Sequence, residues 1–202
     1  MLPYLSKKIT SSFITREIIK AEDQEIYAYS FEILLATLLN FLCLCLLALI
    51  TGTVWETAFY LLSFLPLRQF VGGYHAKNHL RCFFILVTVY GAFLLLLFFL
   101  PTYLYGVVVL PAMIVSLAVV FVFAPVADEN KPLSLHEVSV FKRNSRIAII
   151  IYSMIIGLLF VFPIMQVYSL SLSLGALSVA LSLVASVLKQ QILGHSLLNS
   201  KN

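Results

Sequence analysis

One polar stretch, residues 68–82, holds the side chains best suited to covalent chemistry. It reads RQFVGGYHAKNHLRC, lies between long apolar runs, and contains two of the four histidines and one of the three cysteines. A thiol beside an imidazole is a nucleophile with its base, because the imidazole takes the thiol proton and the resulting imidazolium stabilises the thiolate. The stretch therefore predicts a cysteine–histidine pair built on Cys82 and on either His75 or His79.

Spacing distinguishes the two histidines. On a continuous helix His79, three residues before Cys82, could contact it directly. His75 is seven residues away, a rise of about 10 Å on a helix, so pairing it with Cys82 requires a bend or an unwound segment that faces a cavity. The preceding Gly72-Gly73 pair breaks regular structure and allows close backbone approach. Spacing alone favours His79.

Two other interpretations of this stretch remain open. His75, His79 and Cys82 fall on one helical face and have ligand-competent spacing for a metal ion. A fourth ligand is not obvious, however, and the neighbouring basic side chains would repel a cation. The stretch could also be a plain cytoplasmic loop with snorkelling basic side chains. The remaining cysteines, Cys43 and Cys45, lie inside an apolar run and are interpreted as inert core residues.

Composition determines the class of protein that carries this stretch. Of the 202 residues 61% are hydrophobic and 11% are charged, and the mean hydropathy is +1.02; an ordinary soluble domain has about 25% charged residues. These values exclude a soluble globular enzyme, a disordered chain and a fibrous repeat, and they predict an all-α polytopic membrane protein. The net charge of +4 is not accompanied by a nucleic-acid motif, so we expect the basic residues to set topology and contact anionic lipid.

The apolar residues form six segments behind an amphipathic start. We expect a single integral membrane domain over 1–202, with a surface helix over 1–29, membrane segments within 30–188 and a tail over 189–202. The second segment is short and could be re-entrant. In the last segment, a run of serines favours close helix packing through small residues. The six segments are 31–51, 54–67, 83–100, 106–125, 147–165 and 170–188.

The basic residues predict the orientation of these segments. All 13 Lys and Arg residues fall in alternate connecting regions and the two ends, and the three opposite loops hold none. Positive charge is retained on the cytoplasmic side of a membrane. Both termini and the stretch with His75 and Cys82 are therefore expected in the cytoplasm. The basic regions are 1–30, 68–82, 126–146 and 189–202.

Two motifs resemble those of the accessory gene regulator B family of bacterial membrane endopeptidases. The first is Arg68 followed by Gly72-Gly73-x-His-Ala and then Cys82, and the second is A-P-x-x-x-x-N-K-P over 124–132. The resemblance also extends to the chain length near 200 residues, the amphipathic start and the multi-span layout. The resemblance implies that Cys82 is the nucleophile and His75, rather than His79, is its general base.

The same resemblance implies a reaction, a partner and a location. Such proteins cut a short quorum-sensing pro-peptide, with an amphipathic leader and an acidic tail, on its C-terminal side. The acyl group stays on the enzyme as a thioester and then passes to a thiol or hydroxyl of the same peptide, which gives a thiolactone or lactone. The resemblance implies a homodimer in the bacterial cell membrane, with membrane lipids as further partners and without a cofactor or metal.

Basic and glycine residues around the pair are the candidates for binding the peptide. Arg68 could hold the acidic part of the peptide or stabilise the oxyanion, and the backbone amides of Gly72 and Gly73 are the other oxyanion candidates. The second basic region would serve as a docking surface for an acidic peptide. A cluster of basic residues that only sets the membrane topology would have the same sequence pattern. Its residues are Lys131, Lys142, Arg143 and Arg146.

A small transporter or channel without covalent chemistry is the alternative function. Six membrane segments could line a path for a solute. Transport pathways commonly need charged groups in mid-membrane, whereas Glu32 and Glu56 both lie near segment ends. The residue pattern therefore favours the endopeptidase.

Overall fold

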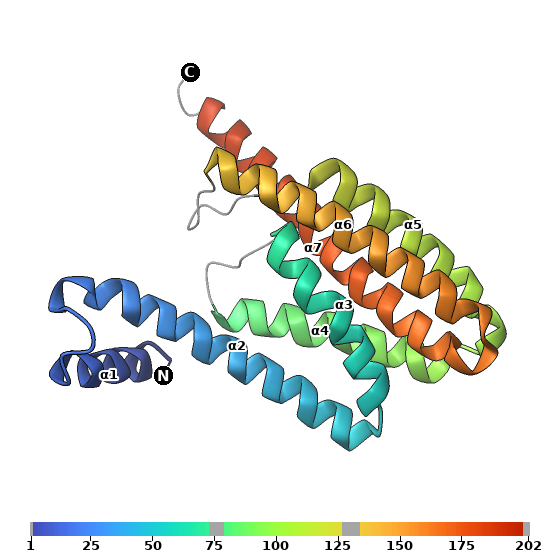
Figure 1. The fold of residues 1–202 in the computed structure, drawn as a ribbon, viewed down its shortest axis with the longest axis horizontal. Coiled ribbons are helices and arrows are strands. Elements are labelled where there is room, and N and C mark those ends of the chain that lie inside the picture. The colour runs from blue at the N-terminus through green and yellow to red at the C-terminus, as the bar shows by residue number, and fades with distance from the viewer. Residues whose placement is uncertain (1, 73–78, 127–133, 200–202) are drawn as a thin grey trace. The chain divides into compact units, whose positions relative to one another are not determined.

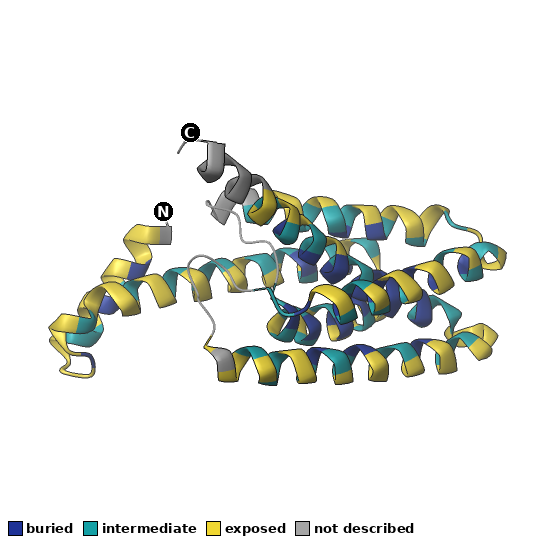
Figure 2. Cartoon of the chain, turned by 90° about the horizontal axis from the view of Figure 1, so that it is seen from above, coloured by how far each residue is buried: buried dark blue, intermediate teal, exposed yellow. Residues whose placement is uncertain are grey.

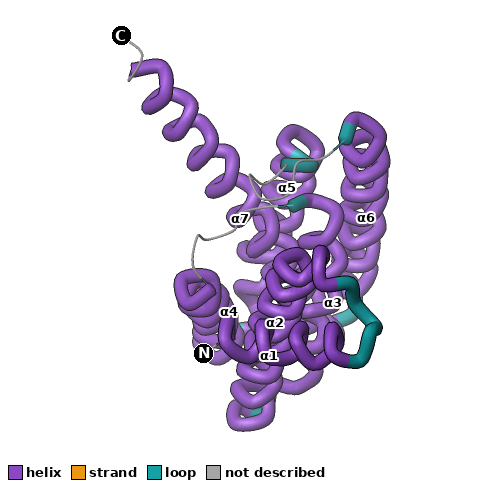
Figure 3. Tube along the Cα trace, turned by 90° about the vertical axis from the view of Figure 1, so that its left-hand side faces the viewer, coloured by secondary structure: helices purple, strands orange, loops and turns teal. Residues whose placement is uncertain are grey.

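The chain is built from helices. The computed structural model describes residues 2–72, 79–126 and 134–199, and these ranges contain no strand (Figures 1 and 3). Three short 3-10 turns, Ala21–Asp23, Thr102–Leu104 and Pro163–Met165, precede α2, α5 and α7. The predicted all-α class is confirmed. The helices are α1 (Leu2–Thr15), α2 (Gln24–Thr51), α3 (Val54–Val71), α4 (His79–Phe99), α5 (Tyr105–Phe123), α6 (Leu135–Val161) and α7 (Gln166–Asn199).

Five helices of the described part are long and apolar enough to cross a membrane, namely α2, α4, α5, α6 and α7. Large apolar side chains, including Leu95, Ile114 and Met154, are exposed along them, and exposed residues run the length of the helices in Figure 2. Such faces suit contact with lipid chains. The second predicted segment is the helix α3, which is not among the five and carries Glu56 in its first turn and Arg68 in its last.

The first of two compact units, Met1–Gly52, contains α1 and α2. The two helices pack together, and the rings of Phe13 and Phe31 stack with centroids 5.5 Å apart. The amphipathic helix ends at Thr15 instead of continuing to residue 29 as predicted. Glu17 has a φ of 56°, and the Ile18 N–H donates to the Phe13 carbonyl at 3.1 Å. This left-handed cap closes the helix, and only glycine normally adopts it without strain.

The second unit, Thr53–Asn202, is organised around α7. This helix packs against α3, α4, α5 and α6. The apolar stretch of α7 is 61% buried, compared with 11% to 22% in the other four membrane-crossing helices. Burial of apolar side chains on several sides makes α7 the central helix of the unit. One core cluster lies at the end of the unit where α3 and α5 finish, and consists of Leu67, Val71, Val120, Ala124, Ile149, Ala176, Val179 and Leu183.

Small residues bring α3 and α7 into close contact, as the serine-rich pattern predicted. A Cβ on Gly175 would collide with the Tyr60 carbonyl oxygen and the Ser63 hydroxyl. Ser63 Oγ donates to the Leu172 carbonyl at 2.9 Å, and the Tyr60 hydroxyl donates to Ser178 Oγ at 2.9 Å. Backbones that approach this closely gain dispersion contacts and hydrogen bonds that lipid cannot supply. These contacts fix the position of α3, whose last turn carries Arg68.

Candidate active site

The last turn of α3 positions the first residues of the polar stretch. Leu67 and Val71 are fully buried in the core, so the residues between them lie at a fixed point of the unit. Arg68 is half-buried, and its Nη1 donates a hydrogen bond to Ser182 Oγ on α7. A guanidinium held in this way is oriented before any ligand arrives. Arg68 therefore lies at the start of the candidate site as a positioned cation.

Gly72 ends α3 and joins it to the segment that follows α5. It forms a parallel bridge with Val126, in which the Val126 N–H donates to the Val71 carbonyl at 3.1 Å. Gly72 has a φ of 75°, and a Cβ there would collide with the Val126 carbonyl oxygen. Both the backbone conformation and the close approach require glycine. The structure thus brings the beginnings of the two sequence motifs together, a contact that the sequence did not predict.

Cys82 lies in the first turn of α4, four residues into a helix that begins at His79. Its side chain is half-buried and not in a disulfide. Cys43 and Cys45 lie well inside α2 and are also free thiols. Both are half-buried within a membrane-crossing helix, and their interpretation as inert core residues stays a prediction. The structure therefore distinguishes Cys82 by its place in the first turn of a helix, at the end of the polar stretch.

Three predicted site residues, Gly73, His75 and Lys131, lie outside the described residues. The pairing of Cys82 with His75 or His79 consequently stays a prediction. The metal interpretation shares His75 and is also untested. Among the side chains that the structure describes, no group of three or more His, Cys, Asp or Glu residues could hold a metal ion.

The second basic region is partly helical. Residues from Leu135 onward belong to α6, whereas the sequence was interpreted as a connecting region up to residue 146. Ser134 and Glu137 form a capping box, with Ser134 N–H donating to Glu137 Oε2 at 2.9 Å and Glu137 N–H donating to Ser134 Oγ at 3.3 Å. The S-x-x-E spacing that specifies this cap is visible in the sequence. It could have placed the start of α6 correctly.

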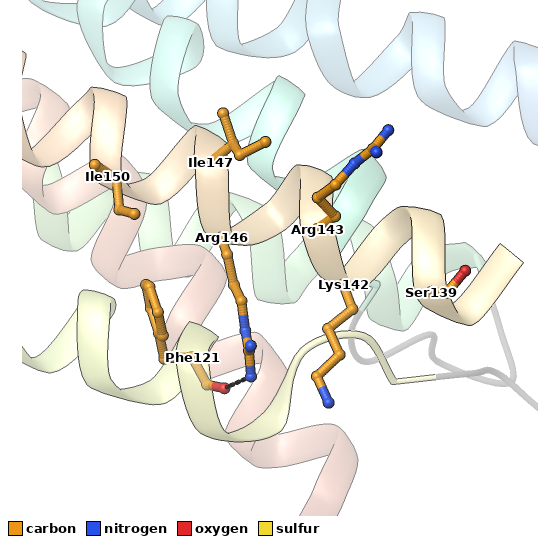
Figure 4. A pocket seen from close by; sticks show the side chains of 7 residues that line it. All are labelled: Phe121, Ser139, Lys142, Arg143, Arg146, Ile147 and Ile150. Carbon is orange, nitrogen blue, oxygen red and sulfur yellow. Dashed lines mark hydrogen bonds between the residues drawn. The ribbon is translucent and has the colours of Figure 1, made fainter.

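The three predicted basic residues of α6 differ in their surroundings. Lys142 and Arg143 are exposed, and Arg146 is half-buried. The Arg146 Nη2 donates to the Phe121 carbonyl at 3.0 Å, and its guanidinium carbon lies 5.2 Å from the centroid of the Phe121 ring. In Figure 4, Lys142 and Arg146 extend toward the end of α5, while Arg143 extends to the other side of α6. Arg146 is thus fixed against α5, and the other two cations are free to reach a ligand.

The fold and the site define a class of protein, a polytopic helical membrane protein with a cysteine at the start of one of its membrane helices. Comparison with protein families is more specific. The sequence model described as accessory gene regulator B matches residues 6–185, so the chain belongs to the accessory gene regulator B family and has a role in the agr quorum-sensing system. The resemblance found in the two motifs is confirmed. No match was found among curated proteins or among solved structures.

Proposed function

We propose that the protein is a membrane cysteine endopeptidase that cleaves a quorum-sensing pro-peptide, with Cys82 as nucleophile and His75 as general base. Membership of the accessory gene regulator B family is the observation that carries this proposal. The position of Cys82 supports its choice among the three cysteines, because it ends the polar stretch and lies in the first turn of α4. Cys43 and Cys45 lie within a membrane-crossing helix without such polar neighbours.

The first chemical step transfers the acyl group of the peptide to the enzyme. His75 accepts the Cys82 proton, and Sγ attacks the scissile carbonyl carbon to form a C–S bond. The tetrahedral intermediate expels the amine of the C-terminal fragment, which takes the proton from the imidazolium as the C–N bond breaks. The N-terminal fragment remains attached to Cys82 as a thioester.

The second step closes the ring. A thiol or hydroxyl within the peptide attacks the thioester carbonyl, and Cys82 leaves as a thiol with its proton restored. The product is a thiolactone or lactone that still carries its N-terminal leader. Water would hydrolyse the thioester and lose its acyl activation, so the bound peptide must exclude solvent from Cys82.

Arg68 and the glycines supply electrostatic help in this proposal. The negative oxygen that develops at the scissile carbonyl needs donors that are already oriented. Backbone N–H groups at Gly72 and Gly73 are one source, and the Arg68 guanidinium is the other. The hydrogen bond from Arg68 to Ser182 supports a fixed position for that cation. Arg68 and Lys131 together would also attract the acidic tail of the pro-peptide.

The proposal includes an orientation and an assembly. The basic regions favour both termini and the Cys82 end of α4 on the cytoplasmic side, where a newly made pro-peptide is available. We infer that the chain works as one integral membrane domain and as a homodimer, as the family resemblance implies.

Cleavage by cysteine variants tests the proposal. A short peptide with an amphipathic leader and an acidic tail, sought in the reading frames beside that of this protein, is incubated with membranes containing the wild type, Cys82→Ala, or a Cys43→Ala/Cys45→Ala control. The control should cleave at close to the wild-type rate, and Cys82→Ala should produce no C-terminal fragment although it inserts normally. Cleavage by Cys82→Ala would refute the proposal. Protection of Cys82 from a thiol-reactive label by the pro-peptide would separate this function from that of a transporter.

A further inference from the structure

A pocket of about 440 Å³ lies along the first turns of α6 beside the end of α5 (Figure 4). Its polar end is formed by Ser139, Lys142, Arg143 and Arg146. Its apolar end is formed by Ile147 and Ile150, and Phe121 lies beside Arg146. None of these lining residues is acidic. The pocket therefore suits a molecule with a negatively charged head and an apolar remainder.

The order of these residues along α6 gives the pocket a direction. Spacings of three and four residues put the backbone positions of these residues along one side of α6, and the Arg143 side chain extends from there to the other side of the helix (Figure 4). From Lys142 to Ile150 the helix rises about 12 Å, and the lining changes over that length from cationic to aliphatic. Because α6 is one of the membrane-crossing helices, its basic turns belong at the level of the lipid headgroups and the isoleucines beside acyl chains.

Arg146 has unused hydrogen-bonding capacity in this pocket. One guanidinium nitrogen, Nη2, donates to the Phe121 carbonyl, and the group lies over the Phe121 ring. The Nε–H is buried and has no hydrogen-bond partner among the described residues. A guanidinium carries five N–H donors and binds phosphate oxygens through two of them at once. A small rotation of the Arg146 guanidinium toward a phosphate would give the Nε–H a hydrogen-bond acceptor.

The apolar end distinguishes a lipid from other phosphate or carboxylate ligands. The side chains of Ile147 and Ile150 are 49% and 43% exposed, and they continue into the exposed Ile151 and Met154. An inorganic phosphate or an acidic peptide tail would leave this surface uncovered. An acyl chain would cover it and bury apolar area. We propose that this pocket binds an anionic phospholipid, with its phosphate between Lys142 and Arg146, positive charge added by Arg143, and one chain along Ile147 and Ile150.

Lipid retention by the purified full-length protein tests this site without the pro-peptide. The protein is exposed to equal amounts of phosphatidylglycerol and phosphatidylcholine in detergent, and the bound lipids are counted by native mass spectrometry. The wild type should retain phosphatidylglycerol preferentially. Lys142→Gln/Arg143→Gln should reduce that retention about ten-fold. Arg146→Lys keeps the positive charge but should also reduce retention, because the forked guanidinium donor is lost.

A matched variant controls for general attraction between positive charge and anionic lipid. Lys7→Gln/Lys8→Gln removes the same charge from two exposed residues of α1, and it should leave retention within about two-fold of the wild type. Equal losses in the two double variants would overturn the proposal, as would equal retention of both lipids. Unchanged lipid retention with weakened pro-peptide binding in Lys142→Gln/Arg143→Gln would instead assign the pocket to the peptide. Cys82→Ala should retain lipid like the wild type. The lipid measurement therefore tests the pocket independently of the proposed catalysis.

Discussion

Gly72 and Val126 lie in direct backbone contact, so the end of α3 and the segment after α5 are joined at one point. The Val126 N–H donates to the Val71 carbonyl at 3.1 Å, and Gly72 has no room for a Cβ. Gly72 belongs to the first and Val126 to the second of the two motifs that the family resemblance depends on. In the proposed enzyme, this contact fixes Gly72 and Val126, one residue of each motif, relative to each other.

Replacement of Gly72 should impair activity through this contact. In Gly72→Ala the new methyl group meets the Val126 carbonyl oxygen, and the φ of 75° is strained for alanine. We expect pro-peptide cleavage to fall at least about ten-fold, because a displacement near 1 Å in a site can cost much more. Gly52→Ala is the matched control, since Gly52 has a φ of 70° but nothing within 4 Å. Equal activity of the two variants in a cleavage assay would contradict this role.

Ser182 should act on the peptide through Arg68. Ser182→Ala removes one hydrogen-bond acceptor of the Arg68 guanidinium, which then loses orientation. We expect a several-fold higher KM for the pro-peptide, corresponding to about 1 kcal/mol for one hydrogen bond. A Ser182→Thr variant should restore the wild-type KM.

Ser171→Ala provides the control for that measurement. Among the described residues, Ser171 Oγ donates to the Val167 carbonyl of its own helix at 2.9 Å, so its loss should leave KM unchanged. Equal KM values for Ser182→Ala and Ser171→Ala in steady-state kinetics would show that Ser182 does not position Arg68.

The close contact between α3 and α7 makes Gly175 a test of stability. Gly175→Ala places a methyl group against the Tyr60 carbonyl and the Ser63 hydroxyl. Overpacking of this kind typically costs about 1–3 kcal/mol, so thermal unfolding followed by circular dichroism should shift to a lower temperature. Gly157→Ala, within α6 and with nothing within 4 Å, should unfold at the wild-type temperature or above it. Identical unfolding of both variants would be inconsistent with the packing described.

The two histidines of the polar stretch should differ in their effect on cleavage. If His75 is the general base, His75→Ala should lose at least about a hundred-fold in rate, and His79→Ala should retain most of the activity. A single-turnover cleavage assay with saturating pro-peptide measures the chemical step. The reverse order of activities would assign the base to His79, as helical spacing alone favours.

The helices could be predicted because long apolar runs and the positions of charges specify them. The segments that became α2, α4, α5 and α7 were recognised in this way. The start of α6 was missed, since its first turns are polar and only the capping box of Ser134 and Glu137 indicates them. The amphipathic helix was predicted too long because its end depends on the left-handed conformation of Glu17, a residue without the usual signature of a helix cap.

The candidate site was predictable in its residue types and not in its contacts. The sequence identified Arg68, Gly72 and Cys82 from one polar stretch. Their partners Ser182 and Val126 lie far away along the chain and meet them only through the packing of α3, α5 and α7. No spacing rule connects residues at such separations, because tertiary packing determines them. The pocket formed with Phe121 was missed for the same reason.

The acyl-enzyme itself gives the most direct test of the proposed chemistry. Purified protein is mixed with its pro-peptide, quenched in acid and analysed by intact mass spectrometry, followed by peptide mapping. We predict a transient adduct that adds the mass of the N-terminal peptide fragment, as its free acid, less one water. The adduct should be located on Cys82 and released by hydroxylamine as a thioester. Cys82→Ala should show neither the adduct nor the C-terminal fragment. Peptide cleavage without an adduct on Cys82, or with one on another residue, would contradict the account.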